Sequence, residues 1–310
     1  MIIAIDLTYN PYGGSFSQIE NIFKYIDTYK YEKYIIYCTH TNYLTFKVYE
    51  SEKIIFKVSQ LSSLSKVTRI LWTQLLLPFH LLIDNVSVLF CPGNFSPIFA
   101  FTKKIQWIGT VGPFEQEFYK DFPFIGKINL LINKYMMIFS ALTSKHVIFE
   151  SKYTRDLFIT NYFFDKSKSS VINLGRDDYF SLASDNNTHI TKHYKSKNFL
   201  LAVSHLYPYK NLEVLLHAIN KNNDPDLICL IAGKFHTKSY HQKLVNLCNE
   251  LSLEEKIFFL GGVSKEELKE LYSNCEIFIF TSPFENFAYT LVEAMSCGAA
   301  VVATNTTAMP

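Results

Sequence analysis

The feature that most constrains the fold is a regular alternation of short apolar runs with longer amphipathic segments. Six apolar runs in the first half have the length and the β-branched or aromatic content of buried strands. They are residues 2–7, 34–38, 54–58, 86–90, 104–108 and 146–150. Residues 16–26, 64–82 and 125–141 instead have the apolar spacing of helices. Strands that alternate with helices predict a parallel sheet covered on both faces.

The alternation restarts after a polar interruption. Residues 181–197 lose apolar periodicity, as a linker between domains would. Beyond them, strand-like and helix-like segments follow one another again, up to the apolar run at residues 298–304. A chain of 310 residues, of which 48% are hydrophobic and 19% charged, is long enough to bury two cores. We therefore predict an α/β protein with two doubly wound Rossmann-like domains, residues 1–180 and 198–310, joined by this linker.

Composition excludes several classes of protein. A net charge of +2 is too balanced to indicate nucleic-acid binding. The six cysteines show no Cys-x-x-Cys spacing, which favours buried thiols in a reducing cytosol over disulfides. The start of the chain lacks the basic region of a secretion signal. The longest apolar stretch, residues 71–90, is interrupted by polar residues and a proline, so it is not expected to span a membrane.

The segment VSHLYPYKNLEVLLHAI places a lysine where a strand gives way to a helix. The strand ends at Ser204, Pro208 marks a turn, and Lys210 and Asn211 open a helix that carries its leucines on one face. A helix N-terminus already attracts anions through its free N–H groups and partial positive charge, so an added lysine predicts a phosphate site. An exposed lysine in a first helical turn is the alternative interpretation of this stretch taken alone.

A second helix start carries two glutamates eight positions apart. In SPFENFAYTLVEAMSCG, Glu285 falls in the loop after a strand, and Glu293 falls in the helix that begins near Ala288. Carboxylates accept hydrogen bonds from sugar hydroxyls, and the backbone amides after Glu285 would face the same cleft. Two solvated glutamates, favoured by the helix dipole, are the alternative.

In combination these motifs resemble those of retaining, nucleotide-sugar-dependent glycosyltransferases of the GT-B fold, family four (glycosyl transferases group 1). In residues 198–310 the matching segments are VSHLYPYKN, LIAGK, FFLGGVSKEELKELYSNCEIFIFTS and the glutamate pair followed by AMSCGAAVVAT. The first half matches more loosely, through YNPYGG, LFCPGNFSP, VGPFE and VIFESKYTRDLF leading to VINLGRDDYF. The resemblance implies two Rossmann-like domains that face a cleft. It also implies that the second domain is truncated, because family members continue past the equivalent of Pro310.

The resemblance further implies roles for individual residues. Glu285 would contact the hydroxyls of the donor sugar, Glu293 those of the nucleotide ribose, and Lys210 would neutralise the diphosphate. We expect Glu285 and Lys210 to act in catalysis, with no metal and no cofactor besides the nucleotide-sugar co-substrate. The whole predicted donor-binding set is Gly13, Gly14, His205, Lys210, Gly233, Gly262, Val263, Glu285, Asn286, Phe287, Ala288, Tyr289 and Glu293.

The chain also departs from the family pattern. The family usually has arginine at the position of His205 and glycine at that of Ala288, so a weaker diphosphate contact and a tighter sugar pocket are expected. Gly109 and Thr110 stand where a histidine or asparagine often lies near the reacting centre, so no catalytic base is assigned. Glu115 is either an acceptor-side residue or, as loop position favours, an exposed glutamate.

We therefore expect a retaining glycosyltransferase that moves a sugar from a nucleotide-diphosphate donor to a glycan or lipid-linked acceptor. Surface polysaccharide biosynthesis in the bacterial cytoplasm is the expected setting. Peripheral contact with the inner face of the plasma membrane stays open, although helices such as residues 64–82 more often belong to a core. A catalytically inert scaffold and a truncated gene product are the alternatives. The glutamate spacing disfavours an epimerase, and NPYGGS lacks the G-x-G-x-x-G pattern of a dehydrogenase.

Overall fold

The computed structural model describes residues 1–11, 13–26, 31–120, 122–181, 194, 198–222, 224–235 and 237–310. The chain divides into two compact units, Met1–Leu174 and Gly175–Pro310. This boundary lies earlier than the predicted end of the first domain at residue 180. Residues 175–180 belong to the second unit because Tyr179 and Phe180 pack in its core. Most of the predicted linker, residues 181–197, lies outside the described residues.

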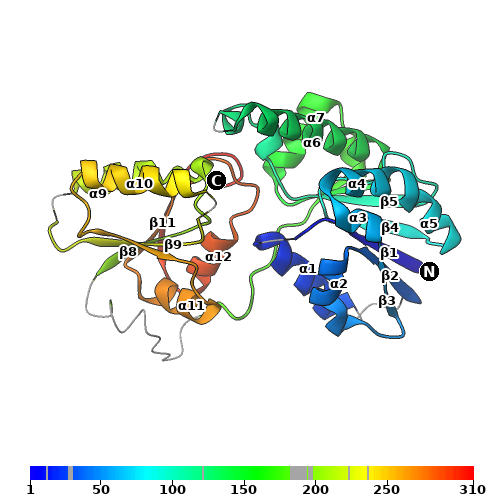
Figure 1. Ribbon diagram of the computed structural model, residues 1–310, viewed down its shortest axis with the longest axis horizontal. Coiled ribbons are helices and arrows are strands. Elements are labelled where there is room, and N and C mark those ends of the chain that lie inside the picture. Colours follow the sequence, from blue (N-terminus) through cyan, green and yellow to red (C-terminus); the bar gives the residue numbers. More distant parts are fainter. Residues whose placement is uncertain are drawn as a thin grey trace. The chain divides into compact units, whose positions relative to one another are not determined.

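Unit 1 is built on a seven-stranded parallel sheet in the order β3-β2-β1-β4-β5-β6-β7 (Figure 1). Its strands are β1 Ile2–Leu7, β2 Lys33–Cys38, β3 Ile54–Val58, β4 Val88–Cys91, β5 Lys103–Ile108, β6 His146–Phe149 and β7 Ser169–Val171. All six predicted strands are confirmed. The edge strand β7 escaped prediction because its three residues include two serines and carry no apolar run.

The helices of unit 1 cover both faces of this sheet. They are α1 Gly14–Tyr25, α2 His40–Phe46, α3 Gln60–Leu64, α4 Lys66–Leu71, α5 Leu77–Ile83, α6 Phe124–Thr143 and α7 Lys152–Tyr162. The predicted helix at residues 64–82 is instead α4, a π-helical turn at Trp72–Leu76 and α5. The wide turn accommodates Pro78, which has no N–H and would crowd the carbonyl four residues before it.

In unit 1, the direction in which each strand-helix-strand connection crosses the sheet determines which face its helix covers. The connections β3 to β4 and β5 to β6 cross the sheet in the same direction, so right-handed crossovers put α4–α5 and α6 on one face and α1 on the other. The cores agree with this. Trp72 and Leu77 pack with Ala4 of β1, whereas Ile19 of α1 packs with Ile5, which points to the opposite side of that strand.

Unit 2 has a five-stranded parallel sheet in the order β10-β9-β8-β11-β12. Its strands are β8 Phe199–Val203, β9 Ile228–Ala232, β10 Ile257–Gly261, β11 Ile277–Phe280 and β12 Ala300–Ala303. Its helices are α9 Leu212–Lys221, α10 Lys238–Glu250, α11 Lys265–Asn274 and α12 Tyr289–Ser296. Figure 1 shows α9 and α10 on one side of the strands and α11 and α12 on the other, which confirms the predicted sheet with two covered faces.

Strand order in unit 2 reverses between β8 and β11, which are hydrogen-bonded neighbours. The connection after β8 leads to one edge of the sheet and the connection after β11 leads to the other. The loops that follow these two strands therefore leave the sheet side by side at its carboxyl edge. Ligands of open α/β sheets bind at such a reversal.

Candidate functional site

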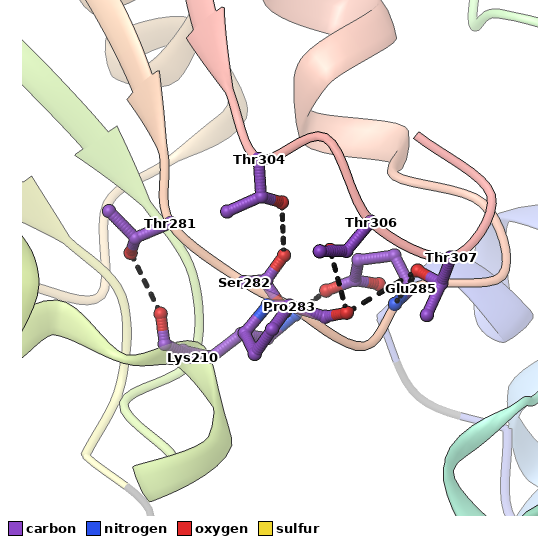
Figure 2. Close-up of polar contacts among 8 residues, drawn as sticks. All are labelled: Lys210, Thr281, Ser282, Pro283, Glu285, Thr304, Thr306 and Thr307. Carbon is purple, nitrogen blue, oxygen red and sulfur yellow. Dashed lines mark hydrogen bonds and ion pairs between the residues drawn. The ribbon is translucent and has the colours of Figure 1, made fainter. Parts of the chain in front are cut away.

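The two loops at this reversal bring Lys210 and Glu285 into direct contact. Lys210 ends the short 3-10 turn Pro208–Lys210 after β8, and Glu285 lies in the loop after β11. The Nζ of Lys210 donates a hydrogen bond to Oε1 of Glu285, forming an ion pair (Figure 2). The side chains are only 14% and 13% exposed, so both charges are largely withdrawn from solvent. The two side chains thus lie together at the carboxyl edge of the sheet.

The surroundings of Lys210 explain how its ammonium is held. Asn211 follows it in the left-handed conformation (φ 55°) and is the N-cap of α9, so Lys210 precedes this helix rather than lying in its first turn. The Nζ lies 5.1 Å from the ring centre of Tyr209 and 5.6 Å from that of Phe280. The backbone carbonyl of Lys210 accepts a 2.8 Å hydrogen bond from the Thr281 hydroxyl, which ties the two loops together. A carboxylate and two aromatic faces therefore fix the cation.

Three threonines after β12 hold the loop that carries Glu285 (Figure 2). The backbone N–H of Glu285 donates to Thr307 Oγ1 at 3.1 Å. Thr304 Oγ1 donates to the carbonyl of Ser282 at 2.6 Å, and Thr306 Oγ1 and Thr307 Oγ1 donate to that of Pro283 at 2.9 and 3.4 Å. The sequence analysis missed these supporting residues. The signal was the cluster ATNTT directly after the last apolar run.

A small cavity lies behind Lys210, between the ends of β8 and β11. Its volume is about 10 Å³, close to the minimum that holds one water molecule. Ser204 and Ser282 line it, and their buried hydroxyl oxygens have no hydrogen-bond partner among the described residues. The lysine is therefore bordered by further polar groups besides Glu285.

Glu293 lies further along α12 and has a different environment. Its Oε2 accepts a 3.2 Å hydrogen bond from the hydroxyl of Tyr272, a fully buried residue of α11. Burial raises the pKa of the Glu293 carboxyl, against the lowering effect of the Tyr272 hydrogen bond. The nearby charges of Asp177 and Lys265, which form an ion pair with each other, act on it in opposite directions. Glu293 is thus a partly desolvated acceptor held by one donor.

Two glycines shape the loops beside Lys210. Gly233 follows β9 with φ 146°, and a Cβ there would lie 1.8 Å from the carbonyl oxygen of Ser204. Its N–H donates a 2.7 Å hydrogen bond to the carbonyl of Gly261, so the ends of β8, β9 and β10 are drawn together. Gly262 is exposed, and a Cβ there would meet only side-chain carbons of Lys234, the nearest at 3.0 Å. Gly233 therefore has a structural requirement that Gly262 lacks.

The remaining predicted residues of unit 2 range from buried to exposed. Asn286 and Ala288 are buried, and Ala288 starts α12 without a side-chain hydrogen bond to its first turn. The rings of Phe287 and Tyr289 meet edge to face, 5.3 Å between centres. The other two follow β8 and β10: His205 is exposed, and Val263 packs partly against the core.

In unit 1, the residues singled out from the sequence lie at the start of α1 and in the segment that follows β5. Gly13 has φ 56°, and it precedes Gly14, the first residue of α1. The N–H of Gly109 donates a 2.7 Å hydrogen bond to Asn94 Oδ1. Thr110 follows in the same loop after β5. Glu115 is not the exposed loop glutamate that we expected, because it is partly buried and accepts a 2.5 Å hydrogen bond from the Tyr153 hydroxyl.

Unit 1 also holds two buried carboxylates that the sequence analysis missed. Asp6 at the end of β1 and Glu150 after β6 are both nearly inaccessible to solvent. Burial raises the pKa of the Asp6 carboxyl, although a hydrogen bond from Thr8 opposes this. Glu150 accepts a 2.9 Å hydrogen bond from the Trp107 indole. The available signal was an acidic residue at the carboxyl end of two apolar runs.

Among the described residues, no group of three or more histidine, cysteine, aspartate or glutamate side chains could hold a metal ion. No helix in this part of the chain combines the length and apolar character needed to cross a bilayer. All six cysteines are free thiols, and only Cys275 is not fully buried.

Comparison with known proteins identifies relatives of both halves. Residues 184–310 match the family model described as "Glycosyl transferases group 1". The chain is 28% identical over 185 residues to the "O-antigen chain mannosyltransferase RfbU" of Salmonella typhimurium, covering 60% of this chain and 48% of the relative. It is 36% identical over 107 residues to a Campylobacter jejuni enzyme named "N-acetylgalactosamine-N,N'-diacetylbacillosaminyl-diphospho-undecaprenol 4-alpha-N-acetylgalactosaminyltransferase", covering 34% of this chain and 28% of that relative. The chain thus spans about half the length of the first curated relative and less than a third of the second.

Solved structures match nearly the whole chain. Anabaena Alr3699/HepE in complex with UDP and glucose superimposes with a TM-score of 0.71 at 19% identity, covering 98% of this chain and 80% of that one. WaaG, described as a glycosyltransferase involved in lipopolysaccharide biosynthesis, gives 0.73 at 12% identity, covering 99% and 82%. These likenesses confirm the predicted α/β fold with two Rossmann-like sheets.

Proposed function

We propose that this chain, whose residues 184–310 match the glycosyl transferases group 1 model, transfers a sugar from a nucleotide-diphosphate donor to a glycan or lipid-linked acceptor. The contact between Lys210 and Glu285 at the strand-order reversal carries the proposal. An ammonium that is withdrawn from solvent suits a diphosphate, and a carboxylate beside it suits sugar hydroxyls. The diphosphate and the sugar of one donor molecule would therefore each find a complementary side chain, and these two side chains are adjacent.

The proposed reaction begins when the bond between the anomeric carbon and the diphosphate oxygen breaks. The bonding electrons leave with the nucleoside diphosphate, so negative charge grows on its terminal phosphate. Lys210 would stabilise that charge, and a preorganised donor of this kind commonly contributes about 3 kcal/mol. Glu285 would turn from Lys210 to the donor sugar when the phosphate takes its place. The acceptor oxygen then bonds to the anomeric carbon, with retention of its configuration, and its proton passes to the departing diphosphate oxygen. Because Lys210 supplies the positive charge, the proposal needs no metal.

The wider setting is proposed from the relatives. The printed names describe an O-antigen mannosyltransferase and an enzyme acting on a diphospho-undecaprenol acceptor, which supports surface polysaccharide biosynthesis with a lipid-linked acceptor. A solved neighbour was crystallised with UDP and glucose, which supports a nucleotide-sugar donor. We propose a location in the cytoplasm, where free thiols are stable, with peripheral contact at the inner face of the plasma membrane.

Calorimetric titration of UDP, GDP, ADP and their sugars tests the proposal. The chain should bind at least one of these nucleotides, and Lys210→Ala should lose about ten-fold or more in affinity for it. Glu285→Ala should bind the free diphosphate at least as tightly as the parent, because the competing carboxylate is gone, and should lose the preference for its sugar conjugate. Lys221→Ala, at the far end of α9, is the matched control and should bind as the parent does. A parent chain that binds none of them would support the inert scaffold, which the presence of His205 and Ala288 favours.

A further inference from the structure

Helix α6 carries an apolar face that nothing in the described structure covers. Its buried side packs against the sheet through Met137, Ile138 and Ala141. On the other side, eight large apolar residues recur at helical spacing and are each between 42% and 76% exposed. They are Phe124, Ile125, Ile128, Leu131, Ile132, Tyr135, Phe139 and Leu142. A helix that is apolar on both sides needs a second apolar partner.

A second exposed apolar group lies on the same face of the sheet. Large side chains of α4, the π-helical turn, α5 and the loop after β4 point into solvent, and Phe99 is the most exposed of them at 82%. The group consists of Leu71, Leu75, Leu76, Phe79, Leu82, Ile83, Phe99 and Phe101. In unit 2, only Val214, Phe235, Met295 and Val302 are large apolar residues of comparable exposure among the described ones. The exposed apolar area is thus concentrated in unit 1.

Specific contacts join the two groups. The rings of Phe79 on α5 and Phe101 in the loop lie 6.5 Å apart between centres. The buried Lys104 donates hydrogen bonds to the carbonyl of Ile98 at 3.0 Å and to Thr143 Oγ1, at the end of α6, at 2.8 Å. The loop is therefore tied to α6 on one side and packs against α5 on the other. Together the two groups form one surface, called here the apolar surface.

Apart from Asp84, which follows α5, is paired with Lys57 and has a side chain only 10% exposed, the charges of the segments that form this surface have one sign. Residues 64–83, 95–104 and 122–145 contain lysine and arginine but no aspartate or glutamate. Lys66, Lys103, Lys127 and Lys145 are exposed. A second copy of this chain would bring the same cations against them, which disfavours self-association through this face. Exposed apolar side chains flanked by cations instead complement an anionic lipid headgroup layer.

We propose that the apolar surface docks on an anionic lipid bilayer, with α6 and α5 lying in the plane of the interface. The Phe, Leu and Ile side chains enter the boundary between headgroups and acyl chains, and the lysines contact lipid phosphates. The proposal identifies which surface makes the peripheral membrane contact of the proposed function. It therefore rests on that proposed contact. The residues on which the proposed function depends, Lys210 and Glu285, lie in unit 2, so the two activities fail separately.

Co-sedimentation of the full chain with phosphatidylcholine vesicles, with and without phosphatidylglycerol, tests the proposal. The chain should bind the anionic vesicles, and salt should weaken that binding. Leu131→Glu should reduce vesicle affinity by about ten-fold or more. The substitution removes a leucine that the bilayer would bury and adds a negative charge that the anionic lipids repel. Lys127→Glu should reduce vesicle affinity by about 25-fold. Each cation near the anionic surface strengthens binding about five-fold, and a charge reversal removes this attraction and adds a repulsion of similar size.

The matched control is Val214→Glu, an apolar position on α9 of unit 2 that is 53% exposed, against 46% for Leu131. It should bind vesicles as the parent does. Thermal unfolding and nucleotide titration of every variant should match the parent, which separates lost docking from lost folding or lost donor binding. The proposal is overturned if Leu131→Glu binds anionic vesicles as well as the parent, or if phosphatidylglycerol has no effect. It is also overturned if the parent binds no vesicles and instead forms a dimer that Leu131→Glu dissociates.

Discussion

The contact between Lys210 and Glu285 makes diphosphate binding a competition within the protein. Before a nucleotide can use the ammonium, it must replace the carboxylate that already holds it. Glu285→Gln removes the competing charge and keeps the shape of the side chain. We therefore predict that this variant binds free UDP more tightly than the parent, although it should bind the sugar moiety of UDP-sugars less well.

The size of the gain follows from the burial of the pair. At an effective dielectric constant of about 20, unit charges about 4 Å apart attract by about 4 kcal/mol. Desolvation offsets much of this attraction, and a charge-assisted hydrogen bond contributes a net 1.5–3 kcal/mol, roughly. Because both side chains keep some solvent contact, we take the lower end. A difference of about 1.4 kcal/mol corresponds to about ten-fold tighter UDP binding.

Isothermal titration of UDP into four proteins measures this competition. They are the parent, Glu285→Gln, Lys210→Met and the double variant. The gain from Glu285→Gln should vanish when Lys210 is already replaced, since no ammonium remains to be released. Glu213→Gln provides the control, because it breaks the Lys243–Glu213 ion pair between α9 and α10 without touching Lys210. The reasoning fails if Glu285→Gln binds UDP no more tightly than the parent, or if the gain persists in the double variant.

Two further predictions concern unit 2. The pKa of Glu293 is raised on folding, so the ionised form of this side chain destabilises the folded state. This destabilisation is absent at a pH below the ordinary pKa of 4.5, and it is complete at a pH above the raised pKa. Glu293→Gln should therefore raise the melting temperature near neutral pH but not in acid, and should weaken nucleotide binding; an equal shift at both pH values would contradict this. Gly233→Ala should cost about 3 kcal/mol or more of unfolding free energy by denaturant titration, because its Cβ meets the Ser204 carbonyl. Gly262→Ala should cost little, and equal losses in the two variants would refute the steric argument.

Most of the fold could be read from the sequence because its elements are encoded locally. Apolar runs such as residues 199–203 and 228–232 are long enough to mark buried strands, and the intervening helices carry their apolar residues at regular spacing. The short strand β7 and the π-helical turn before Pro78 were missed, because neither depends on apolar periodicity.

The sequence by itself also determined where the candidate site lies, since parallel strands bring their following loops to one edge of the sheet. Only the tertiary structure decided that Lys210 touches Glu285, that threonines after β12 hold that loop, and that Glu115 is partly buried. It also decided that no other described part of the chain covers one side of α6, where an apolar helix read alone is expected to be core. These outcomes depend on contacts between residues far apart in the chain, and local pattern carries no information about which surfaces meet.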